Sequence, residues 1–104
     1  MASTIRVKAS LRNGLTTVRA IIRHPMHTGY EFDKETKKLI PAHFIENVIV
    51  HHGDNVILQC DWGRAISANP YLSFTFTGAK TGDILRISWS DNLGESDSIE
   101  AGIQ

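Results

Sequence analysis

The chain has 104 residues with 11 basic and 11 acidic side chains, so its formal net charge is zero. A neutral chain exerts little long-range attraction on polyanions, which argues against nucleic acid or an anionic membrane surface as a partner. The single cysteine, Cys60, excludes an intrachain disulfide, and no apolar run approaches the roughly 20 residues that span a bilayer.

The first part of the chain predicts two strands followed by a long excursion. Apolar and polar side chains alternate over residues 5–11, which is typical of a half-buried strand. Asn13-Gly14 is a strong hairpin-turn signal, and a second alternating strand ends at His24-Pro25 because proline cannot donate to a strand ladder. Residues 26–41 are polar and rich in turn residues. We expect a β-hairpin there, with these apolar side chains on its two arms: Tyr30 and Phe32, then Leu39 and Ile40.

The rest of the chain predicts further short strands. Residues 44–50 are rich in β-branched side chains, and Gly53-Asp54 turns the chain back. Three later strands are predicted to point the following side chains into the core: Val56, Leu58 and Cys60; Leu72, Phe74 and Phe76; Leu85, Ile87 and Trp89. A turn at residues 91–94 leads to a final edge strand over about residues 95–101.

This pattern predicts an all-β fold, since no stretch keeps a helical period. About seven or eight short strands separated by turns favour an immunoglobulin-like two-sheet antiparallel β-sandwich. A small barrel is the alternative. No linker or internal repeat is evident, so residues 1–104 are predicted to form one domain.

The five histidines are weak candidates for a metal site, because a metal needs several ligands that converge on one point. His51 and His52 are adjacent, and neighbouring side chains on a strand point to opposite faces. A turn at Pro25 would allow His24 and His27 to converge, but no second ligand pair is evident. We therefore predict no metal, and expect surface histidines, with His24 or His43 bonded to the backbone.

No catalytic residue or cofactor is predicted either. Cys60 is in phase with core side chains and has no basic neighbour to stabilise a thiolate, so it is a poor nucleophile. No nucleophile elbow or glycine-rich phosphate loop occurs. The acidic residues Asp91, Glu95 and Asp97 are interpreted as solvated turn residues, with a calcium site as the alternative. A second hypothesis is a small metal- or redox-active sandwich that uses Cys60 and histidines.

Partner binding is the remaining function class. Arginine, methionine and aromatic side chains are enriched in interface cores, and several of them lie at strand ends or in irregular stretches. The predicted partner-binding residues are Arg23, His24, Met26, Trp62, Tyr71 and Phe74. Packing within the sandwich is an equal alternative for each of them except Phe74, for which the core is the favoured position. A carbohydrate-binding or adhesion sandwich would instead use exposed Trp62 and Tyr71.

The same segments resemble the SoxZ family of sulfur-oxidation proteins. The likeness covers nearly the whole chain, in six ordered segments whose spacing matches the family. They are Ile22-Arg23-His24-Pro25-Met26 with Thr28-Gly29, Leu39-Ile40-Pro41-Ala42-His43-Phe44-Ile45, Asp61-Trp62-Gly63, Asn69-Pro70-Tyr71-Leu72-Ser73-Phe74, Gly78-Ala79-Lys80-x-Gly82-Asp83 and Trp89-x-Asp91-Asn92-x-Gly94-Glu95-Ser96-Asp97-Ser98.

The resemblance implies an immunoglobulin-like subunit that is not an enzyme. It implies a heterodimer with a SoxY-type protein, which carries sulfur intermediates on a cysteine near its own C-terminus during thiosulfate oxidation. It also implies transient contact with other enzymes of the Sox pathway. Whether the isolated chain self-associates through the vacant face is left open.

The resemblance changes the predicted location. The start, Met1-Ala2-Ser3-Thr4, has no charged segment followed by an apolar one, which predicts no signal peptide and by default a cytoplasmic address. SoxZ proteins are understood to reach the periplasm already folded with a signal-bearing partner. A periplasmic location is therefore what the resemblance implies.

Overall fold

The computed structural model describes residues 3–104, which form nine β-strands and no helix. The strands are β1 (Ile5–Arg12), β2 (Leu15–Ile22), β3 (Phe32–Asp33), β4 (Lys38–Leu39), β5 (Ile45–His52), β6 (Asn55–Asp61), β7 (Tyr71–Thr77), β8 (Ile84–Asp91) and β9 (Ser96–Gly102). The predicted all-β fold is confirmed. Within residues 3–104 no helix is long and apolar enough to cross a bilayer.

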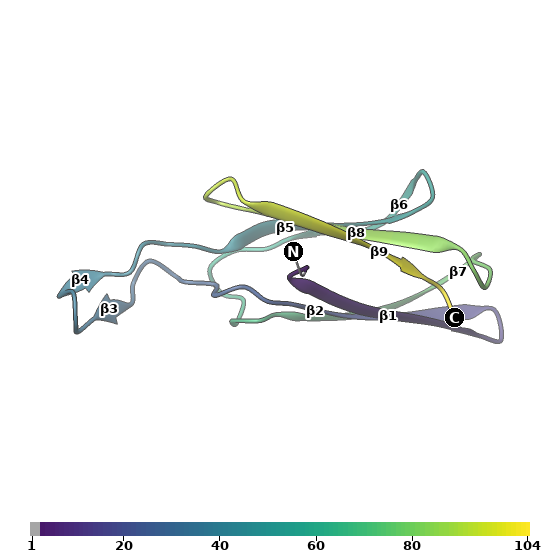
Figure 1. Cartoon of the computed structure of the whole chain (residues 1–104), viewed down its shortest axis with the longest axis horizontal. Helices are drawn as coiled ribbons and strands as arrows, with labels where there is room; N and C mark the ends of the chain where they lie inside the picture. Colours follow the sequence, from purple (N-terminus) through teal and green to yellow (C-terminus); the bar gives the residue numbers. More distant parts are fainter. Residues whose placement is uncertain (1–2) are drawn as a thin grey trace.

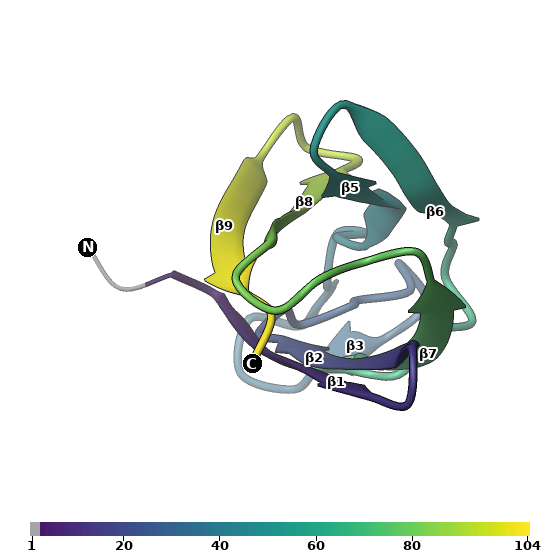
Figure 2. The ribbon, with the colours of Figure 1, turned by 90° about the vertical axis from the view of Figure 1, so that its right-hand side faces the viewer.

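Two antiparallel sheets face each other (Figures 1 and 2). One has the strand order β1-β2-β7 and the other has the order β6-β5-β8-β9. The chain changes sheet between β2 and β5, between β6 and β7, and between β7 and β8. This arrangement confirms the predicted immunoglobulin-like two-sheet antiparallel sandwich.

The core lies between the sheets, where the alternating strands place their apolar faces. Its buried apolar side chains are Ile5, Ala9, Val18, Ala20, Ile22, Met26, Ile45, Val48, Val50, Leu85, Ile87, Trp89 and Ile103. The inward set predicted for β8 is therefore confirmed. Leu72, Phe74 and Phe76 of β7 also pack on this core but stay half-buried, because β7 is an edge strand with a neighbour on one side only.

The inward position predicted for Val56 is wrong, since its side chain is 53% exposed. The register between β5 and β6 shifts at this point: Val50 pairs with Leu58, whereas His51 pairs with Val56. Ile57 is thus an extra residue on β6, and a bulge of this kind reverses the phase of the strand on one side of it. Leu58 and Cys60, beyond the bulge, pack on the core as predicted.

The end of the chain closes one side of the sandwich (Figure 2). Gln104 N donates to Ala9 O over 3.0 Å, and Leu11 N donates to Gln104 O over 2.8 Å. These bonds join the segment after β9 to β1 of the opposite sheet. Ile103 is buried beside them. The two sheets are therefore connected along the β1 and β9 side.

The predicted hairpin is present and projects beyond the sandwich (Figure 1). It is formed by β3 and β4, with Phe32 paired to Leu39 and Asp33 paired to Lys38. The molecule measures 54 × 26 × 20 Å and has a radius of gyration of 15.8 Å. A compact chain of this size would have a radius of gyration of about 13 Å. The hairpin accounts for the elongated shape.

Candidate functional site

The projecting hairpin carries three large apolar side chains that are more than half exposed. Tyr30 is 76% exposed, Phe32 is 59% exposed and Leu39 is 61% exposed. These three residues are called the hairpin patch. They lie beyond the end of the sandwich, so the core does not cover them (Figure 1). Because a two-stranded hairpin is at best marginally stable alone, other contacts must hold it in place.

One such contact comes from the segment between β6 and β7. Arg64 Nη1 donates to the Tyr30 hydroxyl over 3.0 Å. The guanidinium group also lies over two aromatic rings, 5.4 Å from the centre of Tyr30 and 5.8 Å from the centre of Phe44. Cation–π contacts of this kind are attractive and orient both groups. Arg64 therefore connects an exposed arm of the hairpin to the body of the protein.

The base of the hairpin is held by backbone and amide bonds. His27 and His43 form an antiparallel bridge, with N–O distances of 2.7 and 2.9 Å. Asn92 Nδ2 donates to Ala42 O over 2.8 Å, and Phe44 N donates to Asn92 Oδ1, also over 2.8 Å. The two arms approach so closely that a Cβ atom on Gly29, whose φ is +90°, would lie 3.1 Å from the Cβ of Ala42.

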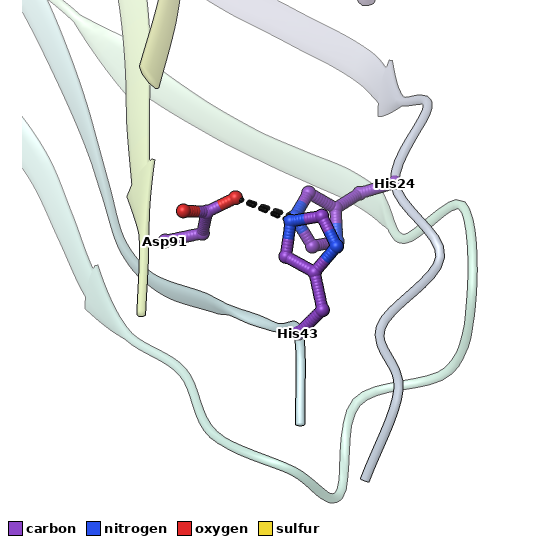
Figure 3. A group of neighbouring side chains, drawn as sticks. All are labelled: His24, His43 and Asp91. Carbon is purple, nitrogen blue, oxygen red and sulfur yellow. Dashed lines mark hydrogen bonds and ion pairs between the residues drawn. The ribbon is translucent and has the colours of Figure 1, made fainter. Parts of the chain in front are cut away.

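A group of three polar side chains, two of them buried, lies just inside this base (Figure 3). His24 follows β2, His43 precedes β5, and Asp91 ends β8. Asp91 Oδ2 is 3.0 Å from His24 Nε2 and 2.8 Å from His43 Nε2. We call these three residues the histidine–aspartate clamp. The clamp joins the chain entering the hairpin, the chain leaving it and the sheet below.

The hydrogen bonds around His24 define its tautomer. Met26 N donates to His24 Nδ1 over 3.1 Å, so Nδ1 has no proton. The proton of the neutral ring is therefore on Nε2, which donates it to Asp91. The other carboxylate oxygen, Asp91 Oδ1, accepts bonds from the amides of Leu93 and Glu95 over 3.0 and 2.8 Å. Every polar atom of the buried His24 and Asp91 side chains thus has a partner.

These bonds keep Asp91 ionised. Burial by itself raises the pKa of the Asp91 carboxyl, but the bonds from His24, the Glu95 amide, His43 and the Leu93 amide outweigh it. The net pKa lies below the ordinary value for aspartate. A buried carboxylate that accepts four hydrogen bonds is a stable structural element rather than a poised acid or base.

The clamp also has the donor atoms of a metal site, since two histidines and one carboxylate offer ligand atoms within 4.8 Å of one another. The bond at His24 argues against that use. A histidine that binds a metal through Nε2 carries its proton on Nδ1 and donates it to an acceptor. Here Nδ1 faces the amide proton of Met26, so such a proton would meet another donor. The geometry favours a hydrogen-bonded clamp over a metal centre.

A comparison with known protein families matches residues 5–102 to the family described as Sulphur oxidation protein SoxZ. The chain belongs to the SoxZ family. A search of curated proteins found no match to it. Membership of the SoxZ family places the chain in the sulfur-oxidation Sox system, whose SoxZ subunits are generally non-catalytic.

Sequence reasoning about the SoxZ histidines was partly wrong. His24 accepts a bond from the backbone, as predicted, but its ring meets His43 rather than His27. The reason is topological: the two residues flank the excursion, and a hairpin returns the chain to the point where it left. The predicted hairpin therefore contained the signal that His24 and His43 lie side by side.

The interpretation of the SoxZ acidic residues as solvated turn residues is right for Glu95 and wrong for Asp91. Asp91 is buried in the clamp, whereas Glu95 is exposed, with Oε1 3.3 Å from His43 Nε2. Asp97 binds a different segment and accepts bonds from the Thr4 hydroxyl over 2.7 Å and from Ser3 over 3.0 Å. The hydroxyl bond from Thr4 is the main cause of the lowered pKa of Asp97. Asp91 and Glu95 thus share His43, whereas Asp97 holds a separate contact.

Cys60 of this SoxZ chain is half-buried against the core. Burial raises the pKa of its thiol, and the nearby charge of Asp61 raises it further. The thiol therefore remains protonated at neutral pH, and a protonated thiol is a poor nucleophile and a poor metal ligand. This agrees with the sequence interpretation of Cys60 as a packing residue.

The six residues predicted to bind a partner lie in different environments in this SoxZ chain. Arg23 and Tyr71 are exposed, and Trp62 and Phe74 are half-buried against the core. His24 and Met26 are buried within the chain and present almost no surface to a partner. The set as a whole stays a prediction. The hairpin patch was missing from it, although aromatic side chains in a polar excursion were a visible signal.

Proposed function

We propose that this SoxZ-family chain is the non-catalytic partner of a SoxY-type sulfur-carrier protein. The two chains form a heterodimer, and the partner carries covalently bound sulfur intermediates during thiosulfate oxidation. Family membership supports the Sox system, and the hairpin patch is the observation that supports partner binding. Three large apolar side chains on a projecting arm are costly to leave in water and suit burial against another protein.

The hairpin is built as a positioned arm rather than a loose one. The clamp, the backbone bridge and the Arg64 contact fix its base and one of its flanks. An arm that is already ordered loses little conformational entropy on binding, which strengthens the complex. A stable interface buries about 1,200–2,000 Å² in total, so the patch supplies anchors within a larger contact.

The state of Cys60 and of the histidine–aspartate clamp supports a non-catalytic role. The Cys60 thiol is protonated, and the buried His24 and Asp91 of the clamp have their hydrogen bonds satisfied. Neither group offers a nucleophile or an open coordination position. The sulfur chemistry is therefore assigned to the partner's cysteine. The purified chain alone is expected to leave thiosulfate unchanged.

Co-purification with a SoxY-type protein, followed by titration calorimetry, tests the proposal. We expect a one-to-one complex, and about tenfold weaker binding or more for a variant that combines Phe32→Ser with Leu39→Ser. The matched control combines Val56→Ser with Ile84→Ser, which also replaces two exposed apolar side chains but lies on the four-stranded sheet.

The outcomes distinguish the proposed function from the proposed role of the hairpin patch. If the unaltered chain and the SoxY-type protein elute separately at micromolar concentration, the proposed function is wrong. If the complex forms but the hairpin variant binds as tightly as the control variant, partner binding stands and the hairpin patch is not its anchor.

The proposal extends to location, because SoxZ proteins are understood to act in the periplasm. We place this chain there, exported in the folded state with its signal-bearing partner. Expression with a SoxY-type partner that lacks its leader should then leave this chain in the cytoplasmic fraction. Appearance in the periplasm without that leader would contradict co-export.

A further inference from the structure

The two sheets differ sharply in charge. No acidic residue precedes Glu31, and none occurs in β7. The outer face of the β1-β2-β7 sheet therefore carries basic residues without any acidic one. They are Arg6, Lys8 and Arg12 of β1, Arg19 of β2, and Arg23, which directly follows β2. All five side chains are exposed. We call them the basic face. The strands of the other sheet carry mostly acidic residues: Glu46, Asp61, Asp91, Asp97 and Glu100, against Arg86.

The register concentrates these charges on one surface. The exposed positions of β1 and β2 alternate with the buried ones that face the opposite sheet, so they lie on the outer surface. Lys8 is directly opposite Arg19, the central strand's basic residue, and like charges in directly opposed positions destabilise a sheet. In residues 3–104 every close ion pair involves a histidine, so no carboxylate neutralises this surface. The opposed pair of Lys8 and Arg19 lowers the stability of the sheet, so folding alone does not explain it.

The shape and composition of the basic face suit a protein partner. Two shallow hollows lie on it, one beside Arg6 and Arg23 and the other beside Lys8, Arg12 and Arg19. At one end Ile21 pairs with Tyr71, and both are exposed among the arginines. Arginine with aromatic and aliphatic side chains is typical of protein interfaces. A sheet that binds single-stranded RNA uses several stacked aromatic rings instead.

We infer that the basic face is a second docking surface, which binds an acidic protein surface by charge complementarity. The whole chain is neutral, so the attraction acts at short range and is reversible by salt. The face lies along the side of the sandwich, whereas the hairpin patch lies beyond its end (Figure 1). One chain thus holds a partner on the hairpin and admits a second, acidic protein on the β1-β2-β7 sheet.

Fluorescence anisotropy with a labelled peptide of alternating glutamate and glycine tests the inference, with the full chain as titrant. We expect binding at low salt that weakens about tenfold or more near 1 M salt, where the Debye length is about 3 Å. Arg19→Glu should weaken binding at least about tenfold and Arg19→Gln by less. Arg19→Glu places a carboxylate opposite Lys8, so it should fold at least as stably as the unaltered chain.

The control is Lys80→Glu, which makes the same change in net charge at an exposed turn between β7 and β8. Equal affinity of the Arg19→Glu and Lys80→Glu variants would overturn the inference, as would binding that salt leaves unchanged. Tighter binding of a DNA oligonucleotide, or of vesicles that contain phosphatidylserine, would also overturn it. So would salt-dependent self-association on size exclusion, because the acidic sheet of a second copy would then be the ligand. None of these measurements uses a SoxY-type protein, so they are independent of the proposed function.

Discussion

The base and the tip of the hairpin reverse the usual distribution of side chains. At the base, His24 and Asp91 are polar and buried, and each has its hydrogen bonds satisfied. At the tip, Phe32 and Leu39 are apolar and exposed. The polar side chains at the base hold the hairpin in position, because their hydrogen bonds are directional and fix how the hairpin leaves the sandwich. The exposed apolar side chains at the tip are available for contact with another molecule. We therefore expect substitutions at the base to change mainly the stability of the protein, and substitutions at the tip to change mainly partner binding.

The largest expected effect is at the base. Asp91→Ala removes the acceptor of two imidazole and two amide hydrogen bonds and leaves buried donors unpaired. We expect the free energy of unfolding to fall by about 3–5 kcal/mol, because each buried donor left without an acceptor costs about 1–3 kcal/mol. Urea denaturation followed by circular dichroism measures this. A loss below about 1 kcal/mol would show that the clamp does not hold the base.

A smaller effect at the base follows from pH. The pKa of Asp91 is lowered in the folded state, so the folded protein binds fewer protons near pH 4 than the unfolded chain. The contribution of Asp91 to stability is complete above the unfolded pKa of about 3.9 and is lost as the pH falls through the lower, folded value. Asp83 and Asp97, whose pKa values are also lowered, act in the same direction.

The measurement for this prediction is urea denaturation between about pH 2 and pH 6, the range that brackets these carboxyl groups. The unaltered chain should lose stability in the acid part of this range. Asp91→Asn should start from a lower stability and depend less on pH, since the amide does not titrate. Parallel pH profiles for the two proteins would contradict the assignment of part of the acid sensitivity to Asp91.

The smallest expected effect on stability is at the tip. Replacing Phe32 and Leu39 by serine removes side chains that touch little of the core, so the free energy of unfolding should change by no more than about 0.5 kcal/mol per site. The same urea experiment measures it beside Asp91→Ala. A large loss at the tip would show that the hairpin patch packs within the chain, and the contrast between base and tip would disappear.

Sequence reasoning was most successful where one strand's own alternation decides the structure. Leu85, Ile87 and Trp89 were predicted to face the core and do so, because period-two spacing is a local property. Val56 was placed wrongly because a bulge is a property of two paired strands, and the β6 sequence alone does not encode it. The hairpin itself was found from its turn residues.

The clamp was missed because its parts come from three distant places in the chain. His24, His43 and Asp91 meet only after the excursion has returned and β8 has paired with β5. No local pattern marks such a meeting, and Asp91 in a turn-like context was reasonably expected to be solvated. The basic residues of β1 and β2 were visible in the sequence, but their gathering on one face became clear only with the register.

The bonds from Gln104 to β1 bear on the open edge of the β1-β2-β7 sheet. A free sheet edge is a template for polymerisation, because its backbone groups accept any extended chain. The bonds to Ala9 and Leu11 occupy backbone groups of β1 that would otherwise be open. Deleting Ile103 and Gln104 should expose these backbone groups of β1 and leave them free to pair with a strand of a neighbouring molecule. Gln104 thus covers part of the β1 edge, where a strand of a second molecule would otherwise have room to pair.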